Sequence, residues 1–142
     1  MTRDQIVAFF AARQRAWDAN DADALGRTHA ERGTVESPIF ATVTGREEIT
    51  ETYHALFRVF AGWRLVSDPI LIDGDRVAQP FTATATHTGE FMGLPGTGRK
   101  FEIHGVLLFE LHDGLIAHER RLYDFTALLI QLGVLRSRPA RP

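Results

Sequence analysis

The second half of the chain consists largely of long extended segments separated by tight turns. Arg76–Thr88, Arg99–His112 and Leu115–Tyr123 are rich in Val, Thr, Ala and Leu, and the turn sequences "DGD" and "HDG" precede the first and the last of them. Asp-Gly turns of this kind join neighbouring antiparallel strands. The sequence therefore predicts an antiparallel meander, and one face of that sheet must be buried against other elements.

The first half predicts the helices that could cover this sheet. Thr2 opens a capping box, and apolar residues at helical spacing predict a helix that ends near residue 19. A short second helix is expected at Ala22–Ala30. A second capping box, formed by Thr44 and Glu47, predicts the start of a third helix with an apolar stripe.

A short closing helix is expected at Phe125–Leu132, where Gly133 provides a C-terminal stop. Helices followed by a meander indicate one α+β domain over residues 1–135, with a loose tail at 136–142. A curved sheet wrapped over the N-terminal helices would leave a pocket open at one end.

Composition excludes several classes of function. The 142 residues carry a net charge of −2, so there is no overall basic field for nucleic acid. The absence of cysteine excludes disulfides and thiolate chemistry. The N-terminal "MTRDQIVAFF" is charged and helical in pattern rather than a signal peptide, and no apolar run is long enough to span a membrane. A cytoplasmic domain without membrane contact is expected.

The Gly-rich segment "GLPGTGRK" resembles a phosphate-binding loop only partly. Arg99 stands in place of the required Lys, Lys100 in place of Ser or Thr, and a strand rather than a helix follows. We interpret this loop as an apolar lid, with Phe91, Met92 and Leu94 facing inward. The histidines show no metal-binding spacing, so no metal site is expected.

Acid–base chemistry is the remaining possibility, and Asp124 is its main candidate. Side chains alternate along a strand, so His118, Arg120, Leu122 and Asp124 share one face, which we predict to be the concave one. Glu36 is the expected partner of Arg120. In an apolar setting, desolvation would raise the pKa of Asp124 and make it a useful base near neutral pH.

Each of these candidates also has a purely structural interpretation. Asp immediately before a helix is a favoured N-cap, worth about 1 kcal/mol. His87 and His104 could be hydrogen-bonded structural groups in their strands, and Trp17 and Trp63 could be core residues rather than a platform for a ligand. Sequence alone leaves both interpretations open.

A family resemblance favours the chemical interpretation. The segments "THTGEFMG", "P-x-TGR", "DG-x-I" and "D-x-x-x-LL-x-QLG" resemble the SnoaL-like polyketide cyclases of the nuclear transport factor two-like superfamily, over Thr2–Leu135. The resemblance implies a cone-shaped α+β barrel, in which a curved, mainly antiparallel sheet wraps over the N-terminal helices around a deep apolar pocket. It also implies cofactor-free catalysis and a homodimer formed through the convex sheet face. It implies that Asp124 is the general acid/base of an intramolecular aldol ring closure, and we assign the steadying of the enolate to His87 or His104. Arg120, on the same strand face as Asp124, is a further candidate catalytic residue.

We also predict which residues contact a small hydrophobic substrate. They are Trp17, His29, Phe40, Trp63, Phe91, Met92, His118 and Leu122. The chain departs from the family at Leu122, where cyclases often carry a histidine, and at Arg120, where many relatives have Trp. A ketosteroid-isomerase pattern fits less well, because its two acid positions hold Ser37 and Gly105 and its tyrosine position holds Arg13. The Asp–Arg–Asp set of the epoxide hydrolases cannot be assembled either.

Three functions follow from these observations. The first is an enzyme that abstracts a proton beside a carbonyl of a polycyclic or aromatic substrate, or a related isomerase, dehydratase or hydrolase. The second is a non-catalytic binding protein for a small molecule. The third is an association module that uses His104, Val106 and Leu108 on the exposed sheet face.

Overall fold

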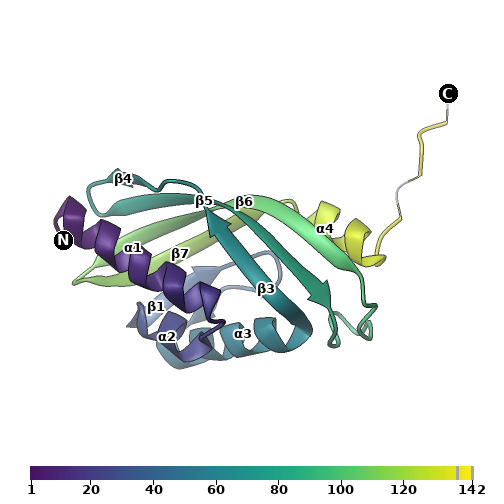
Figure 1. Ribbon diagram of the computed structural model, residues 1–142, viewed down its shortest axis with the longest axis horizontal. Helices are drawn as coiled ribbons and strands as arrows, with labels where there is room; N and C mark the ends of the chain where they lie inside the picture. Colours follow the sequence, from purple (N-terminus) through teal and green to yellow (C-terminus); the bar gives the residue numbers. More distant parts are fainter. Residues whose placement is uncertain (137, 142) are drawn as a thin grey trace.

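A computed structural model describes residues 1–136 and 138–141 and shows an α+β fold, which confirms the expected class (Figure 1). Within these residues there are four helices and a seven-stranded curved sheet. The elements in chain order are α1 (Arg3–Asp18), α2 (Ala22–Arg27), β1 (His29–Glu36), β2 (Val43–Thr44), α3 (Arg46–Val59), β3 (Phe60–Ser67), β4 (Leu71–Asp73), β5 (Arg76–His87), β6 (Lys100–His112), β7 (Leu115–Tyr123) and α4 (Phe125–Leu132).

The sheet has the strand order β2-β1-β7-β6-β5-β3, and β4 pairs with one end of β5. Neighbouring strands are antiparallel except β1 and β7, which run parallel. Helices α1, α2 and α3 lie on one side of the sheet, and the sheet curves over them without closing into a barrel (Figure 1). The sheet therefore has a concave face toward the helices and an outer face.

Strand β6 shows how the concave face forms the core. Its inward residues are apolar and buried, whereas Glu102, His104 and Glu110 between them are exposed. The buried set is Phe101, Ile103, Leu107, Phe109 and Leu111. Phe10 of α1 packs edge-on against Phe109, with ring centroids 4.9 Å apart. Alternation of period two thus places one face of the strand against the helices.

The facing of β7 is opposite to the one expected. Glu119, Arg121 and Tyr123 point into the concave face, while Arg120 and Leu122 are exposed on the outer face. The physical reason is the register with β6, because residues paired across two strands face the same side. Phe109 pairs with Glu119, Leu107 with Arg121 and Gly105 with Tyr123, so the apolar face of β6 carries these β7 residues inward.

Several local signals act as expected. Thr2 and Gln5 form the capping box of α1, and Asp124 caps α4, which ends at Gly133 with a left-handed φ of 81°. The capping box expected at Thr44 is wrong, because α3 is preceded by Gly45 and has no side-chain cap. Thr44 instead pairs with Thr34 as part of β2.

Two other boundaries differ from the expectation. The second helix ends at Arg27 rather than residue 30, so that His29 begins β1. Residues 136–142 were expected to form a loose tail; Ser137 and Pro142 lie outside the described residues, and the described ones lead away from the body without helix or strand (Figure 1). Among the helices of the described residues, none combines the length and apolar character needed to cross a bilayer.

Candidate functional site

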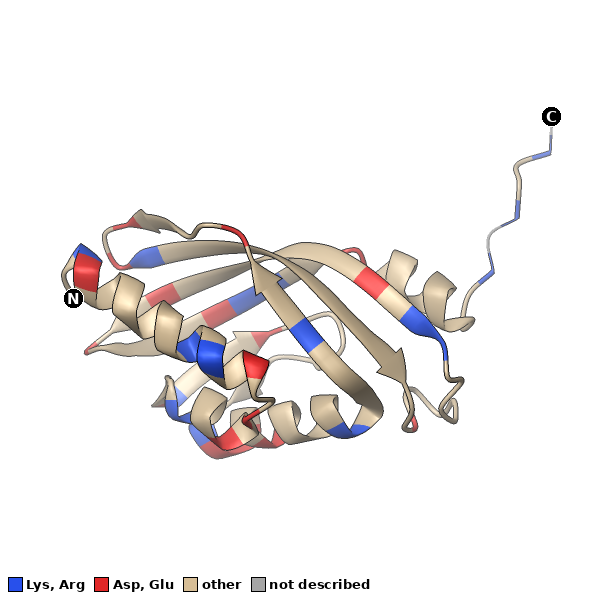
Figure 2. Ribbon diagram, viewed as in Figure 1, with Lys and Arg blue, Asp and Glu red and all other residues tan. Residues whose placement is uncertain are grey.

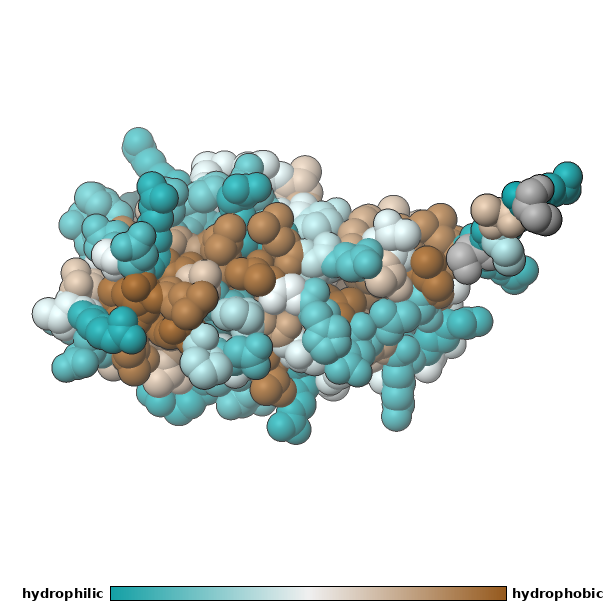
Figure 3. Space-filling view, turned by 90° about the horizontal axis from the view of Figure 1, so that it is seen from above, coloured by the Kyte–Doolittle hydropathy of each residue, from teal (hydrophilic) through white to brown (hydrophobic). Residues whose placement is uncertain are grey.

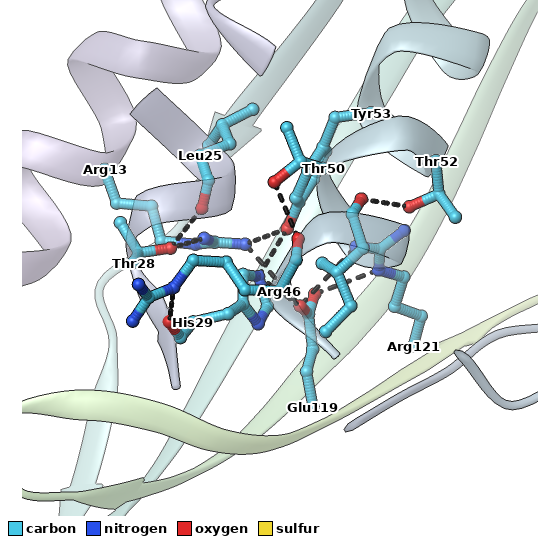
Figure 4. Close-up of polar contacts among 11 residues, drawn as sticks. Arg13, Leu25, Thr28, His29, Arg46, Thr50, Thr52, Tyr53, Glu119 and Arg121 are labelled. Carbon is cyan, nitrogen blue, oxygen red and sulfur yellow. Dashed lines mark hydrogen bonds and ion pairs between the residues drawn. The ribbon is translucent and has the colours of Figure 1, made fainter. Parts of the chain in front are cut away.

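An ionic cluster lies between the helices and the concave face of the sheet, with Arg13, His29 and Glu119 buried and the Arg121 side chain 11% exposed (Figure 4). Its centre is the Glu119 carboxylate. Arg121 donates from Nε to Glu119 Oε1 at 2.9 Å, and Arg13 Nη2 of α1 lies 3.6 Å from Oε2. His29 Nε2, at the start of β1, lies 3.5 Å from the same oxygen. Three elements distant in sequence thus meet at one carboxylate.

Tyr53 of α3 ties the cluster together. Its hydroxyl receives a hydrogen bond from Arg13 Nη2 at 2.8 Å and is hydrogen-bonded to His29 Nε2 at 2.9 Å. Arg13 also donates to the Thr28 hydroxyl, and the Arg121 guanidinium lies 5.1 Å from the centre of the Tyr53 ring. These contacts fix both arginine side chains, because each is held from more than one side.

The electrostatics of the cluster leave one positive charge in excess. Burial would raise the pKa of Glu119, but the Arg121 and Arg13 guanidinium groups outweigh it and hold this pKa at about 2. Burial lowers the pKa of His29 to about 3, despite the nearby carboxylate, and Arg13 lowers it further. At neutral pH two guanidinium groups therefore face one carboxylate and a neutral imidazole.

A small apolar cavity of about 30 Å³ adjoins this cluster on the concave face. Arg121 is the one charged side chain among the described residues that line it, and Tyr123 lies beside it. The remaining lining residues are Trp17, Ser37, Ile39, Phe40, Leu56, Trp63, Leu65, Phe81, Ile103 and Leu107. The deep pocket that the sequence suggested is thus a small cavity here, with room for about one water molecule.

Gly105 makes the position of Tyr123 possible. The two residues pair across β6 and β7, and a Cβ on Gly105 would lie 2.3 Å from the carbonyl oxygen of Leu122 and 2.8 Å from the Cβ of Tyr123. Burial raises the pKa of Tyr123, so its phenol stays protonated at neutral pH. The cavity therefore contains a cation and a neutral hydroxyl donor side by side.

Two tryptophans form the opposite part of the lining. Trp17 at the end of α1 and Trp63 of β3 have ring centroids 6.3 Å apart. The side-chain amide of Asn20, oriented with its nitrogen toward them, donates to the backbone carbonyls of Trp17 and Trp63 at 3.1 and 3.0 Å. The loop after α1 thereby joins the backbone at the end of α1 to that of β3 beside the two rings.

Asp124 lies outside this cavity. It is exposed, and its Oδ1 accepts the backbone N–H of Ala127 at 2.9 Å. This is the helix-cap geometry, and the desolvated setting expected for Asp124 is wrong because the β7 face that carries it is the outer one. In the sequence, Asp124 directly follows Tyr123, which lines the cavity. Its catalytic role stays a prediction.

The expected pairing of Arg120 with Glu36 is present, but on the outer face. Arg120 Nε lies 3.3 Å from Glu36 Oε2, and His118 Nε2 lies 3.1 Å from the same oxygen. The Thr34 hydroxyl contacts the other ring nitrogen of His118 at 2.6 Å. Arg120, His118 and the exposed Leu122 therefore do not reach the cavity.

The two candidate catalytic histidines, His87 and His104, lie in different environments, one buried and one on the outer face. His104 is on the outer face, where it contacts Thr82 at 3.0 Å, which is the exposed sheet face named in the association-module hypothesis. His87 is buried, bonds the Thr97 hydroxyl at 3.0 Å and packs on Phe60 and Phe91. It does not line the cavity.

The Gly-rich loop contributes one buried residue. Phe91 packs against Phe60, with centroids 5.3 Å apart, whereas Met92 has a φ of 52° and is 65% exposed, so its expected inward orientation is wrong. Of the eight expected contact residues, the cavity is lined by Trp17, Phe40 and Trp63. His29 belongs to the ionic cluster instead.

The outer face of the sheet carries a separate groove of about 390 Å³ beside Leu71, Leu108 and Arg120. Seen from above, Figure 3 shows apolar side chains broken up by hydrophilic ones on this side of the molecule. Figure 2 shows acidic and basic residues interspersed along both helices and strands. A homodimer through this face stays a prediction.

In the described residues, no three His, Asp or Glu side chains are grouped to hold a metal ion.

The chain belongs to the SnoaL-like polyketide cyclase family, which matches residues 8–132. AclR from Streptomyces galilaeus, a proposed hydroxylase, is 25% identical, with a TM-score of 0.82 over 97% of this chain and 91% of that one. IdmH from Streptomyces antibioticus, a proposed polyketide cyclase, is 25% identical, with a TM-score of 0.71 over 89% and 97%.

A proposed SnoaL-like polyketide cyclase from Jannaschia sp. CCS1 shares the fold at 22% identity, with a TM-score of 0.80 over 94% of each chain. A search of curated proteins finds no significant match.

Proposed function

We propose that the protein is a cofactor-independent enzyme of polyketide-cyclase type, which removes a proton beside a carbonyl of a hydrophobic substrate and closes a ring by aldol addition. The observation that carries this proposal is the single cation in an apolar cavity. Arg121 lines the cavity, and its Nε and Nη2 are engaged by Glu119, which leaves Nη1 without a hydrogen bond among the described residues.

The chemistry follows from this geometry. Loss of a proton from carbon places negative charge on the adjacent carbonyl oxygen, and the enolate carbon then attacks a second carbonyl of the same molecule. The new alkoxide takes a proton, so the ring closure is an isomerisation overall. Arg121 and the protonated Tyr123 are suited to stabilise the oxyanion at both stages, since donors in a low-dielectric site act strongly on developing charge.

Asp124 is the candidate base in this proposal, on the strength of the family resemblance. It follows Tyr123 directly, and its Oδ2 makes no hydrogen bond among the described residues. The cap to α4 would meanwhile fix the Asp124 backbone.

Deuterium uptake by a panel of β-keto esters in deuterated water tests the proposal. We expect wild-type protein to accelerate uptake, and Tyr123→Phe and Arg121→Lys to lose on the order of 10²-fold or more of that acceleration. Asp124→Asn should abolish it, while Asp113→Asn, in the exposed turn after β6, should not change it. Equal uptake with and without protein would refute the function, and full activity of Asp124→Asn would refute that residue's role.

A non-catalytic binding protein is the second candidate. It is favoured by the ionic cluster, whose two acid–base groups have pKa values of about 2 and about 3 and so transfer no proton near neutral pH. In that case native mass spectrometry of the purified protein should show a small molecule that denaturation releases unchanged. Turnover of the β-keto ester panel would contradict this candidate.

A further inference from the structure

The cavity contains more buried hydrogen-bond donors than the protein itself can pair. The indole nitrogens of Trp17 and Trp63 are buried without a partner among the described residues, and the buried Tyr123 hydroxyl, which lies by the backbone of Ile39, donates to none of them. All three residues line the same cavity, and the two tryptophans are 2% and 8% exposed. Because an indole nitrogen only donates, each needs an acceptor oxygen.

Such unpaired groups are costly, since a buried donor without a partner loses its interaction with water and gains nothing. The cavity of about 30 Å³ has room for roughly one water molecule, which cannot serve three separate donors. Three orphan donors in one apolar space therefore point to a ligand that supplies several acceptors.

We propose that Trp17 and Trp63 are specificity-determining residues, whose indole N–H groups hydrogen-bond two carbonyl oxygens of one substrate. The ligand class is then a hydrophobic compound with two or more carbonyl groups, rather than a monoketone. This inference rests on the proposed function only in taking the cavity as the substrate site. The two N–H groups set the substrate's position, and Arg121 and Tyr123 then meet the carbonyl that becomes the enolate.

The turn between β1 and β2 is where the cavity can enlarge. Ile39 and Phe40 contribute to the lining from a segment without helix or strand. Ser37 holds this turn through bonds between its hydroxyl and the backbone N–H and carbonyl of Phe40, at 3.0 and 3.3 Å. The rest of the lining lies on helices and strands, so a ligand larger than water displaces the turn first.

Proton–nitrogen correlation NMR of the indole groups tests the inference directly. The chain has two tryptophans and therefore two indole signals, which Trp17→Phe and Trp63→Phe assign. The probes are 1-phenylbutane-1,3-dione and 1-phenylbutan-1-one, which differ by one carbonyl. We expect the dione to move both indole proton signals downfield and to bind about fivefold or more tightly than the monoketone.

The variants provide a second measurement. Each Trp→Phe substitution should remove about fivefold of the affinity for the dione and less of that for the monoketone. Phe57→Leu is the matched control, because Phe57 packs edge-on against Trp17 but does not line the cavity. Its preference for the dione should remain that of the wild type.

Three outcomes would overturn the inference: unmoved indole signals at saturating dione, equal affinity for the two probes, or no binding of the dione. Deuterium uptake measured on the same samples separates it from the proposed function. Uptake with unmoved indole signals would refute the role of the tryptophans and keep the enzyme. Moved signals without uptake would support their role and refute the enzyme.

Discussion

Acidification between pH 7 and 5 should destabilise the protein mainly through His29. Burial lowers the pKa of this imidazole from 6.5 in the unfolded chain to about 3 in the folded protein. A group with a depressed pKa contributes stability that is present above its unfolded pKa and is lost as the pH falls toward its folded one. For His29 that interval runs from pH 6.5 down to about 3.

The magnitude follows from the two pKa values. The loss at a given pH is RT ln[(1 + 10^(6.5 − pH))/(1 + 10^(3 − pH))], with the values for the unfolded and folded states. Between pH 7 and pH 6 it amounts to about 0.7 kcal/mol, and between pH 7 and pH 5 to about 2 kcal/mol. Protonation is unfavourable in the fold because burial removes the charge from water, and Arg13 repels it.

Urea denaturation of wild type and His29→Gln at pH 7, 6 and 5 measures the contribution of His29 to the pH dependence of the free energy of unfolding. Glutamine can keep a bond to the Tyr53 hydroxyl but does not titrate, so the variant's free energy of unfolding should fall by about 2 kcal/mol less over this range. His54→Gln, whose side chain is 43% exposed, is the control and should behave like wild type. Parallel curves for wild type and His29→Gln would show that His29 already carries a proton beside Glu119, and the reasoning would be wrong.

Three substitutions test the remaining structural arguments, each by urea denaturation at pH 7. Glu119→Gln leaves two buried guanidinium groups without a counter-charge and should cost about 3–5 kcal/mol, while Glu102→Gln, on the exposed face of β6, should stay within about 0.5 kcal/mol. A loss below that of the Glu102 control would contradict the ionic cluster. Asp124→Ala removes the α4 cap and should cost about 1 kcal/mol, whereas Asp124→Asn, which can still cap, should cost only a few tenths; equal losses would argue against the cap. Gly105→Ala places a methyl against the Leu122 carbonyl and should cost about 1–3 kcal/mol, so an unchanged midpoint would show that β6 and β7 can separate there.

The parts of the fold that were predicted correctly depend on short-range signals. The turns that precede β5 and β7, the capping box at Thr2 and the stop at Gly133 each involve residues within one turn of each other. Such signals need no knowledge of the partner strand. The Thr44 capping box fails for the opposite reason, because pairing of β2 with β1 places that residue in a strand.

The orientation of β7 could not be predicted from the strand's own sequence. Both of its faces carry charged residues, with Arg120 on one and Glu119 and Arg121 on the other. Hydrophobic alternation therefore gives no preference, and the register with β6 decides which face is buried. That single uncertainty put Asp124, Leu122 and His118 into the expected site and left Arg121 and Tyr123 out of it.

The buried charges of β7 depart from the general rule that charged side chains lie at the surface. Glu and Arg are almost never fully buried unless they are paired, and the fold takes on the cost of desolvating Glu119, Arg13 and Arg121 together. Departures of this kind concentrate at functional sites, because an apolar core of the same volume is often at least as stable. Of Glu119, Arg13 and Arg121, Arg121 is the one that also lines the apolar cavity, so the excess positive charge of the cluster lies next to that cavity. The cluster therefore both holds the helices to the sheet and fixes the Arg121 guanidinium at the cavity, which is the cation that the proposed function needs.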